Sequence, residues 1–412
     1  MPEREGARPL TTLDQIDVFD QERYLDGAPY ADFAVLRSQA PVFRNPDPQL
    51  PEGHWAVTRH RDVVHVAREP QLFSSERKGS QPLEFDEVAI DVQRRMMIHQ
   101  DPPKHSRVRT LVSRGFTPKV VEQLRPDIER ECDLIVDAAL EKGELDFVEA
   151  VAAELPLVVI AEVMGIPRED RHRIFAWSKA IAGESDDEHG GAELTRQAVV
   201  DMSGYATELG TSRRRCPVDD IVTRMVSADD KGNQLTEEEF QAFFILMTVA
   251  GNETTRYSIA GGVEAFAQFP GQWARLKAEP GLARSAAEEI VRWVSPTKVF
   301  RRTATADVEL GGSVIKAGEK VMAHITSANR DETVFADPDV FDIGRNPNPH
   351  VGFGGGGPHF CIGKHLAVLE IELMFAALAR RVDRIEITGP TPRLRSYQFG
   401  GIVGMPARVV PA

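Results

Sequence analysis

A stretch from Thr236 to Pro270 constrains the fold of this 412-residue chain more than any other feature. Thr236 is followed three residues later by Glu239, a capping box that predicts a helix start, and Pro270 predicts its end. At 1.5 Å per residue such a helix is roughly 50 Å long. Its middle is apolar on nearly every side, so we expect it to pass through the core. At its centre, AGNET at 250–254 sets small residues beside a carboxylate and a hydroxyl, either for helix packing with Glu253 at the surface or for function.

The rest of the chain alternates between long helical stretches and clusters of short strands. Polar and apolar residues alternate around Gly311-Gly312, which predicts a β-hairpin. We therefore expect a mainly α protein with small β-sheets (α+β), forming a single domain over residues 1–412. Its β-rich part is predicted at approximately 41–75, 296–330 and 385–412, and its helix-rich part at approximately 104–295 and 362–382.

Charge and composition narrow the classes of function. A net charge of −14 argues against nucleic-acid binding. The three cysteines share no C-x-x-C spacing, which argues against a disulfide framework or a structural zinc site and favours a reducing compartment. The first 20 residues mix both signs of charge, and no window approaches about 18 uncharged apolar residues. We therefore expect a cytoplasmic protein without a secretory signal or membrane anchor.

A second unusual stretch, HVGFGGGGPHFCIGKHLAVLE at 350–370, carries four consecutive glycines before Cys361. A helix is predicted to begin near Ile362 or Gly363, and the positive end of its dipole stabilises a thiolate. The glycines would let backbone N–H groups approach the sulfur closely. From these residues alone four interpretations stay open for Cys361: a nucleophile with a histidine as base, a phosphate loop lacking its usual Lys and Ser or Thr, an inert buried cysteine, or a thiolate ligand to haem iron.

Further motifs occur in order around this cysteine. Glu289 and Arg292 stand three apart on one predicted helix, and with Arg345 they are expected to form a buried cluster that braces the loop before the glycines. The ordered set resembles the cytochrome P450 family in its soluble bacterial form, over essentially the whole chain. The motifs that carry the resemblance are DPPKHSRVR at 101–109, AGNETT at 250–255, EEIVR at 288–292 and GFGGGGPHFCIG at 352–363.

The loop from Phe353 to Cys361 is one residue longer than the common pattern of the family. In this it is similar to a subgroup that contains sterol and branched-lipid hydroxylases. The resemblance implies the cytochrome P450 fold, a triangular prism with a long central helix over the haem. It also implies haem b (iron protoporphyrin IX) as cofactor and Cys361 as the proximal thiolate ligand to the metal.

The resemblance assigns further residues to the cofactor and the chemistry. Glu253 and Thr254 are expected to be an acid–alcohol pair that passes protons to oxygen. Cations for the haem propionates are expected from His105, Arg109, Arg302 and His359. The remaining residues expected at the haem are Ala250, Gly251, Phe353, Gly354 and Gly363.

The implied activity is that of a haem-thiolate monooxygenase, which inserts one oxygen atom from O2 into an apolar small molecule. A lipid, sterol side chain or terpenoid is favoured as substrate, with a polyketide or an aromatic carboxylic acid as the alternative. The rival interpretation is a haem-binding sensor or carrier without turnover, and a hydrolase that uses Cys361 as nucleophile is a third. The presence of both Glu253 and Thr254 favours turnover, because a binder needs no proton relay.

Electrons must come from another protein, because the chain contains no flavin or iron–sulfur motif. Residues 93–119 contain seven basic residues and one acidic residue, Asp101, although the chain as a whole is acidic. We expect this segment to dock an acidic ferredoxin, itself reduced by a ferredoxin reductase with NAD(P)H. The basic residues are Arg94, Arg95, Lys104, Arg107, Arg109, Arg114 and Lys119.

The resemblance also indicates which segments line the substrate pocket, and most of their residues are apolar. Lys298 is the exception: it points either outward or into the pocket, and an inward Lys298 would favour a substrate with a carboxylate. The residues expected at the pocket are Met96, Met97, Phe243, Met247, Lys298, Val299, Phe300, Phe399 and Ile402.

Overall fold

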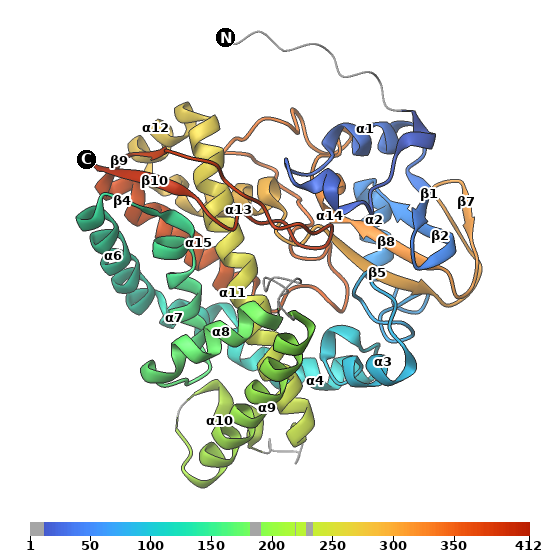
Figure 1. The fold of residues 1–412 in the computed structure, drawn as a ribbon, viewed down its shortest axis with the longest axis horizontal. Helices are drawn as coiled ribbons and strands as arrows, with labels where there is room; N and C mark the ends of the chain where they lie inside the picture. The colour runs from blue at the N-terminus through green and yellow to red at the C-terminus, as the bar shows by residue number, and fades with distance from the viewer. Residues whose placement is uncertain (1–11, 182–190, 219, 228–233) are drawn as a thin grey trace.

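The long helix predicted from the sequence is present as α11, Glu237–Gln268, and it crosses the middle of the molecule (Figure 1). The predicted capping box is confirmed: Glu239 N donates to Thr236 Oγ1 at 3.2 Å, and Thr236 N donates to Glu239 Oε2 at 3.0 Å. The structure is a computed structural model that describes residues 12–181, 191–218, 220–227 and 234–412. Residues 1–11, on which part of the expectation for the N-terminus rests, lie outside the described residues.

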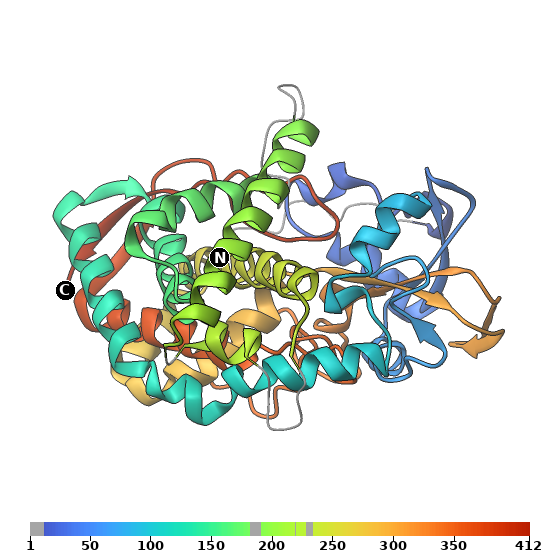
Figure 2. The ribbon, with the colours of Figure 1, turned by 90° about the horizontal axis from the view of Figure 1, so that it is seen from below.

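Helices surround α11 over most of its length, and the outline in Figure 1 is roughly triangular. Seen from below, after a turn of 90°, α9 lies across α11 (Figure 2). The other helices are α1 Tyr30–Gln39, α2 His60–Arg68, α3 Glu87–Gln93, α4 Lys104–Ser113, α5 Pro118–Gln123, α6 Arg125–Lys142, α7 Glu154–Val163, α8 Arg171–Ile181, α9 Gly191–Arg215, α10 Ile221–Val226, α12 Pro270–Ala278, α13 Ala283–Val294, α14 Ile325–Ala328 and α15 Lys364–Arg381.

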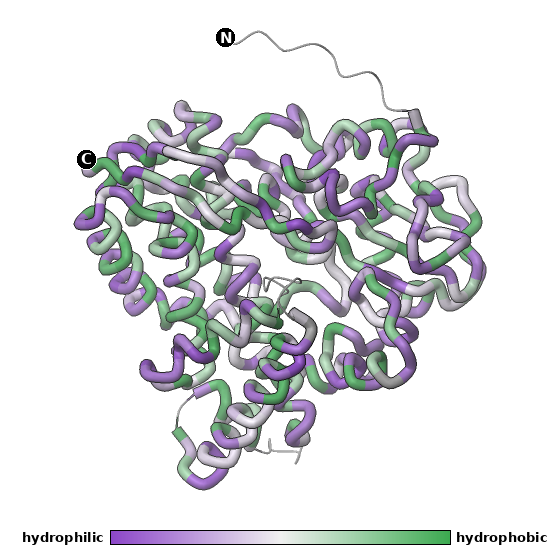
Figure 3. The backbone as a smooth tube through the Cα atoms, in the orientation of Figure 1, coloured by the Kyte–Doolittle hydropathy of each residue, from purple (hydrophilic) through white to green (hydrophobic). Residues whose placement is uncertain are grey.

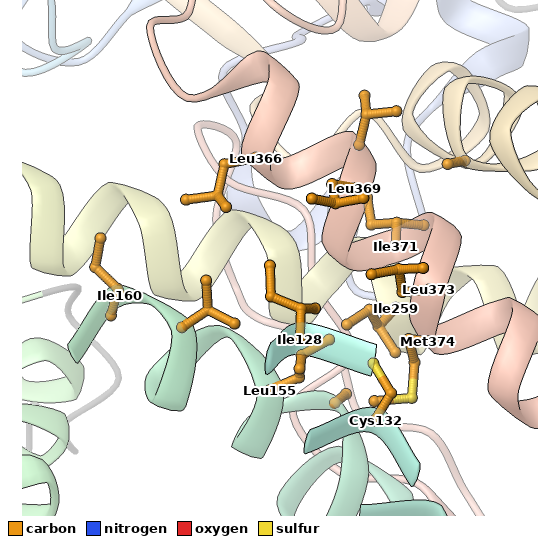
Figure 4. Close-up of a cluster of buried hydrophobic side chains, with 14 of the residues drawn as sticks. Ile128, Cys132, Leu155, Ile160, Ile259, Leu366, Leu369, Ile371, Leu373 and Met374 are labelled. Atoms are coloured by element: carbon orange, nitrogen blue, oxygen red, sulfur yellow. The ribbon is translucent and has the colours of Figure 1, made fainter. Parts of the chain in front are cut away.

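The main core lies where α6, α7, α11 and α15 meet. Figure 4 shows Cys132 of α6, Leu155 of α7, Ile259 of α11 and Leu369 of α15 in this cluster, all of them buried. Burying an aliphatic side chain of this size stabilises the fold by about 1.5–3 kcal/mol. Helices at the rim, such as α6 and α9, alternate between hydrophilic and hydrophobic residues along their length (Figure 3). This amphipathic pattern lets the rim helices turn their apolar residues inward to the core and their polar residues to solvent.

The described residues also form three small sheets, and the largest of them has the strand order β1-β2-β8-β5-β3. This sheet joins strands from before and after the helix-rich part of the chain. The late strand β8 pairs parallel with the early strand β2 and antiparallel with β5. A three-stranded sheet has the order β4-β10-β9, and β6 pairs with β7. The strands are β1 Val42–Asp47, β2 Leu50–Val57, β3 Phe73–Ser74, β4 Glu144–Asp146, β5 Val299–Ala304, β6 Val308–Leu310, β7 Ser313–Ile315, β8 Lys320–His324, β9 Val382–Ile387 and β10 Pro406–Pro411.

The expected mainly α architecture with small sheets is confirmed. Within the predicted helix-rich part, approximately 104–295, the structure also contains β4, a three-residue strand that pairs with β10 from the far end of the chain. A three-residue strand is too short to show an alternation of polar and apolar residues. Its pairing with β10 therefore determines that these residues form a strand. Among the residues that the structure describes, no helix is both long and apolar enough to cross a membrane.

Candidate active site

A deep cavity lies between α11 and the loop that carries Cys361. It holds about 1260 Å³ of space that no protein atom fills, part of it open to solvent. Cys361 lines one wall, and α11 lines the opposite wall with a single face, because its lining residues recur at a spacing of three or four. These residues of α11 are Leu246, Met247, Ala250, Gly251, Thr254, Thr255 and Ser258.

The four glycines before Cys361 are required by the backbone of the loop. Gly354, Gly355, Gly356 and Gly357 all have positive φ, at 98°, 69°, 96° and 74°. A Cβ on Gly357 would lie 2.2 Å from the carbonyl oxygen of Ala67 at the end of α2. These glycines therefore allow a left-handed loop to pack closely on α2.

The Cys361 sulfur instead accepts hydrogen bonds from the backbone N–H groups of Gly363 and Lys364. The helix α15 begins at Lys364, slightly later than expected, so these donors are its N-cap and first residue. Burial raises the pKa of the Cys361 thiol, and the two N–H groups and the Arg109 guanidinium oppose that rise. Cys361 is exposed and lines the cavity, so it can be reached from the cavity.

The four expected propionate partners gather at one side of this cavity. The rings of His105 and His359 lie 4.3 Å apart between centroids, and Arg109 Nη2 donates to the Phe360 carbonyl at 2.6 Å. Within the described ranges, neither Arg109 nor Arg302 has a carboxylate within ion-pair distance. Burial lowers the pKa of Arg302 to about 10 and that of His105 to about 4.

Unpaired buried donors in such a cluster call for an anion. Both ring nitrogens of His105 are buried without a hydrogen-bond partner. Arg302 and Gly354 line a smaller adjoining cavity that shares His359 and Phe300 with the first. The cluster fits a group that carries two carboxylates beside a flat apolar body, and the propionates of haem meet that description.

Two residues near this site were missed in the sequence. His99 is buried, its Nδ1 accepts from Ser80 N at 2.9 Å, and its Nε2 has no partner. It lies inside the basic segment 93–119, but a histidine does not contribute to the charge count that marked this segment. Glu370 of α15 lines the cavity with Oε2 unpartnered, and burial raises its pKa well above the usual range. The available signal was a pair of carboxylates, Glu370 and Glu372, in the otherwise apolar run LAVLEIELMF.

The structure separates the expected acid–alcohol pair onto two faces of α11. Thr254 lines the cavity, where its hydroxyl donates to the Ala250 carbonyl at 2.8 Å. Glu253 is buried beside the cavity, where it forms an ion pair with Arg256 and accepts a hydrogen bond from Tyr257. Burial raises the pKa of Glu253 to about 7, opposed by Lys179 and by that hydrogen bond. The Glu253 carboxyl is thus poised to exchange a proton near neutral pH.

The structure brings Glu289, Arg292 and Arg345 together. Arg292 donates from Nε and Nη2 to the two oxygens of Glu289 at 2.7 and 2.8 Å, and Arg345 Nε lies 3.3 Å from Glu289 Oε1. Arg292 also donates to three carbonyl oxygens in the segment after α14, those of Asn329, Pro338 and Val340. The cluster therefore ties α13 to the chain that leads into the Cys361 loop.

Three of the residues expected at the substrate pocket line the cavity: Met97, Met247 and Phe300. Phe243 does not, because it lies one turn beyond the cavity-lining part of α11 and is buried in the main core. Val299 points to the opposite face of β5 from Phe300, as alternation along a strand requires. Met96, Phe399 and Ile402 are also outside the lining. Lining residues that the sequence did not single out are Ile98, Ile160, Leu246, Pro296 and Thr297.

Lys298 does not enter this cavity, so the expectation that placed it at the substrate pocket is wrong. Its Nζ donates to the Ser396 carbonyl at 2.7 Å and lies 4.4 Å from the ring centroid of Tyr24. The outward alternative is also wrong, since the side chain is 6% exposed. Lys298 lines a second, separate cavity instead.

Comparisons with known proteins agree with this site. The sequence profile of the family described as Cytochrome P450 matches residues 281–400. The chain is 44% identical over 395 residues to a steroid C26-monooxygenase of Rhodococcus jostii, covering 94% of this chain and 83% of the relative. It is 42% identical over 398 residues to a methyl-branched lipid omega-hydroxylase of Mycobacterium tuberculosis, covering 92% and 90%.

Solved structures give the same result for the fold. A Mycobacterium marinum cytochrome P450 in complex with pseudoionone matches with a TM-score of 0.89 at 36% identity, covering 98% of this chain and 99% of that one. A Bacillus megaterium protein in complex with testosterone matches with a TM-score of 0.82 at 31% identity, covering 97% and 99%. The alternative of a haem-binding sensor or carrier without turnover finds no support among these relatives.

Proposed function

The chain belongs to the cytochrome P450 family and is a haem monooxygenase, and from this premise we propose that it hydroxylates the end of a methyl-branched alkyl chain. The two relatives share this chemistry, because a steroid side chain and a methyl-branched lipid both present a branched saturated end. The observation that carries the proposal is the wall of the cavity opposite Cys361, where α11 contributes apolar side chains such as Leu246 and Met247 together with hydroxyls, and no charged side chain.

The cofactor, haem b, supplies oxygen activation when it is bound. We propose that Cys361 is its thiolate ligand and that His105, Arg109, Arg302 and His359 hold its propionates. Phe353 and Gly363 line the cavity beside Cys361, and Ala250 and Gly251 line it from α11. Gly251 leaves room there, since an added Cβ would lie 3.3 Å from the Ile160 side chain.

For the chemistry we propose that Thr254 holds a proton at Oγ1 on the cavity wall. Glu253 would resupply that proton from the far face of α11, after its carboxyl leaves the ion pair with Arg256. The pKa of Glu253 at about 7 suits this task, because a group that titrates near the working pH both gains and gives protons.

The substrate class follows from the polarity of the cavity. The described lining on the α11 side contains hydroxyls but no cation that would pair with a substrate carboxylate, because Lys298 lies in the second cavity. An aromatic carboxylic acid, the alternative substrate, would bury its charge there at a cost of several kcal/mol. Moving an apolar chain end from water into the cavity carries no such free-energy cost.

The test is a substrate screen of the haem-loaded protein by spin-state shift, followed by product analysis by mass spectrometry. A steroid with an intact alkyl side chain and a methyl-branched fatty acid are expected to bind and to gain one oxygen at the chain end. A steroid without the side chain is the matched control and is expected to gain no terminal hydroxyl. Oxidation of the steroid rings with an untouched side chain would refute the proposal.

We also propose that the electron donor is an acidic ferredoxin with its NAD(P)H-dependent reductase, that it docks on the basic segment 93–119, and that the protein works in the cytoplasm. The side chains of Arg95, Lys104, Arg107, Arg114 and Lys119 are exposed, and α4 carries Arg109 to the Cys361 loop. Intramolecular pairs reduce the field of the patch, since Arg107 contacts Glu239 and Arg94 contacts Asp91 at 2.7 Å.

Charge steering makes the docking rate sensitive to salt. Turnover with an acidic ferredoxin is expected to fall as ionic strength rises, and Lys119→Glu is expected to weaken the apparent affinity for the ferredoxin. Lys277→Glu on α12 is the matched control outside the segment. Turnover that is independent of ionic strength in the unmodified protein would contradict docking on this patch.

A further inference from the structure

A second cavity, with about 830 Å³ of space that no protein atom fills, part of it open to solvent, lies on the other side of α11 from the Cys361 loop. The C-terminal half of α11 forms one wall with Tyr257, Gly261, Glu264 and Gln268. These residues recur at a spacing of three or four, on a different face from the residues that line the first cavity. The other walls come from the N-terminal segment 24–30, the end of α13, Lys298, the α14 region and the loop 400–402.

Lys298 presents a charge in this cavity that the protein leaves unpaired. In the part of the chain that the structure describes, no carboxylate lies within ion-pair distance of Lys298. Its ammonium has three donors, and one of them is used by the Ser396 carbonyl at 2.7 Å. Burial lowers the pKa of Lys298 to about 7, with a smaller contribution from Arg393. An anion beside Nζ would relieve that cost.

Two more donors from the α14 region reach the same cavity. Thr326 and Arg330 are four residues apart along the chain, both line the cavity, and they are 2% and 4% exposed. Thr326 Oγ1 and Arg330 Nε are buried without a hydrogen-bond partner. The rest of the Arg330 guanidinium is held in place, because its Nη1 donates to the Pro338 carbonyl at 3.0 Å and to Asp339 Oδ1 at 3.1 Å, and it lies over the Trp293 ring.

The acidic residues of the cavity leave these donors unsatisfied. Glu264 is occupied by Arg393, whose Nη2 lies 2.6 and 2.7 Å from its two oxygens. Asp26 is exposed at the mouth. We propose that this second cavity is a binding site for a small carboxylate, held by Lys298, Thr326 and Arg330. A carboxylate matches the donor set because it has two acceptor oxygens and one negative charge.

The position of the site connects it to the first cavity. Pro296 and Thr297 line the first cavity, and Lys298, the next residue, lines the second. The partition is completed by the loop opposite, because Gly400 N donates to the Pro296 carbonyl at 2.8 Å and Lys298 N donates to the Gln398 carbonyl at 2.8 Å. A carboxylate bound to Lys298 therefore acts on a segment that contacts the substrate. This site goes beyond the proposed function and does not depend on it.

The test is calorimetric titration of the holoenzyme with benzoate, with an azole ligand filling the first cavity so that benzoate cannot bind there. Benzamide is the neutral control of the same size. Benzoate is expected to bind and benzamide to show no heat. Lys298→Met is expected to weaken benzoate binding roughly 10- to 100-fold, the usual effect of losing a charge-assisted hydrogen bond.

Two further variants keep the test decisive if Lys298→Met does not fold. Thr326→Val keeps the ammonium and removes one donor, so a loss of a few-fold is expected. Asp26→Asn removes the negative charge at the mouth, and tighter benzoate binding is expected. A crystal soaked with 4-bromobenzoate is expected to show anomalous density for bromine in the second cavity. Equal binding of benzoate and benzamide, or bromine density in the first cavity alone, would overturn the proposal.

Discussion

Arg292→Met is the perturbation that most directly tests how the Cys361 loop is held. Methionine keeps much of the length of the side chain but removes every donor that Arg292 supplies. The variant loses two hydrogen bonds to Glu289 and three to the carbonyls of Asn329, Pro338 and Val340. Arg292, Glu289 and Asn329 are fully buried, so water does not replace the donors lost to Glu289 and Asn329, whereas the hydrogen bonds to Pro338 and Val340 are only partly buried.

The size of the loss can be worked out from these contacts. Removing one partner of a buried ion pair costs about 3–5 kcal/mol of the free energy of unfolding. Two of the three carbonyls keep another donor, because Arg330 Nη1 donates to Pro338 at 3.0 Å and Arg345 Nη2 donates to Val340 at 2.8 Å. The Asn329 carbonyl loses its Arg292 donor, which costs about 1–3 kcal/mol. Glu289 keeps Arg345 and the backbone N–H of Asp342, at 3.3 and 3.0 Å, which limits the total. We therefore expect a loss of about 4 kcal/mol.

The assay is urea unfolding of Arg292→Met and of the unmodified protein, followed by tryptophan fluorescence. The chain offers a matched control, because Glu193 and Arg196 of α9 form a pair with the same spacing on an exposed surface. Arg196→Met is expected to leave the urea midpoint nearly unchanged. A change for Arg292→Met as small as that for Arg196→Met, at equal slopes, would refute the reasoning about the buried cluster.

Three other variants follow from the structure. Gly357→Ala forces φ of +74° on alanine and a Cβ against Ala67, so we expect the free energy of unfolding to fall by about 2 kcal/mol or more in urea, whereas Gly271→Ala, which meets nothing, should be neutral or stabilising. Thr254→Ala is expected to keep the haem spectrum but to divert electrons from product to hydrogen peroxide; unchanged coupling would remove Thr254 from proton delivery. Because burial raises the pKa of Glu253 from 4.5 to about 7, the unfolded chain loses this proton first and stability falls between those pH values. Glu253→Gln is expected to remove about 2 kcal/mol of that fall between pH 5 and pH 7, seen by urea unfolding at the two pH values, and an unchanged pH slope would contradict the assigned pKa.

The sequence predicted the long helix because its signals are local. The capping box at Thr236 and the stop at Pro270 act within one turn of the chain, and α11 begins and ends accordingly. The residues that meet around the cavity are different, because their positions depend on packing between distant elements. The ordered motifs placed Glu289, Arg292 and Arg345 together, since the family resemblance carries this tertiary information.

The lining of the first cavity shows where sequence reasoning reached its limit. Met247 and Thr254 are on the lining face of α11, but the same spacing extended to Phe243 leaves the cavity and enters the core. Periodicity gives the direction of a side chain and says nothing of where a cavity ends. The prediction that placed Lys298 at the substrate pocket is wrong for a related reason. The partition between the two cavities runs between Thr297 and Lys298, and the position of this partition depends on backbone pairing with residues 398–400.

The central claim is that Cys361 is the thiolate ligand of a haem in the first cavity. The most direct measurement is the absorption spectrum of the haem-loaded protein, reduced and exposed to carbon monoxide. We expect a strongly red-shifted Soret band that is lost in Cys361→Ala and kept in Cys216→Ala, whose thiol is exposed elsewhere on the surface. A band typical of histidine ligation, or a red-shifted band that survives Cys361→Ala, would contradict the account.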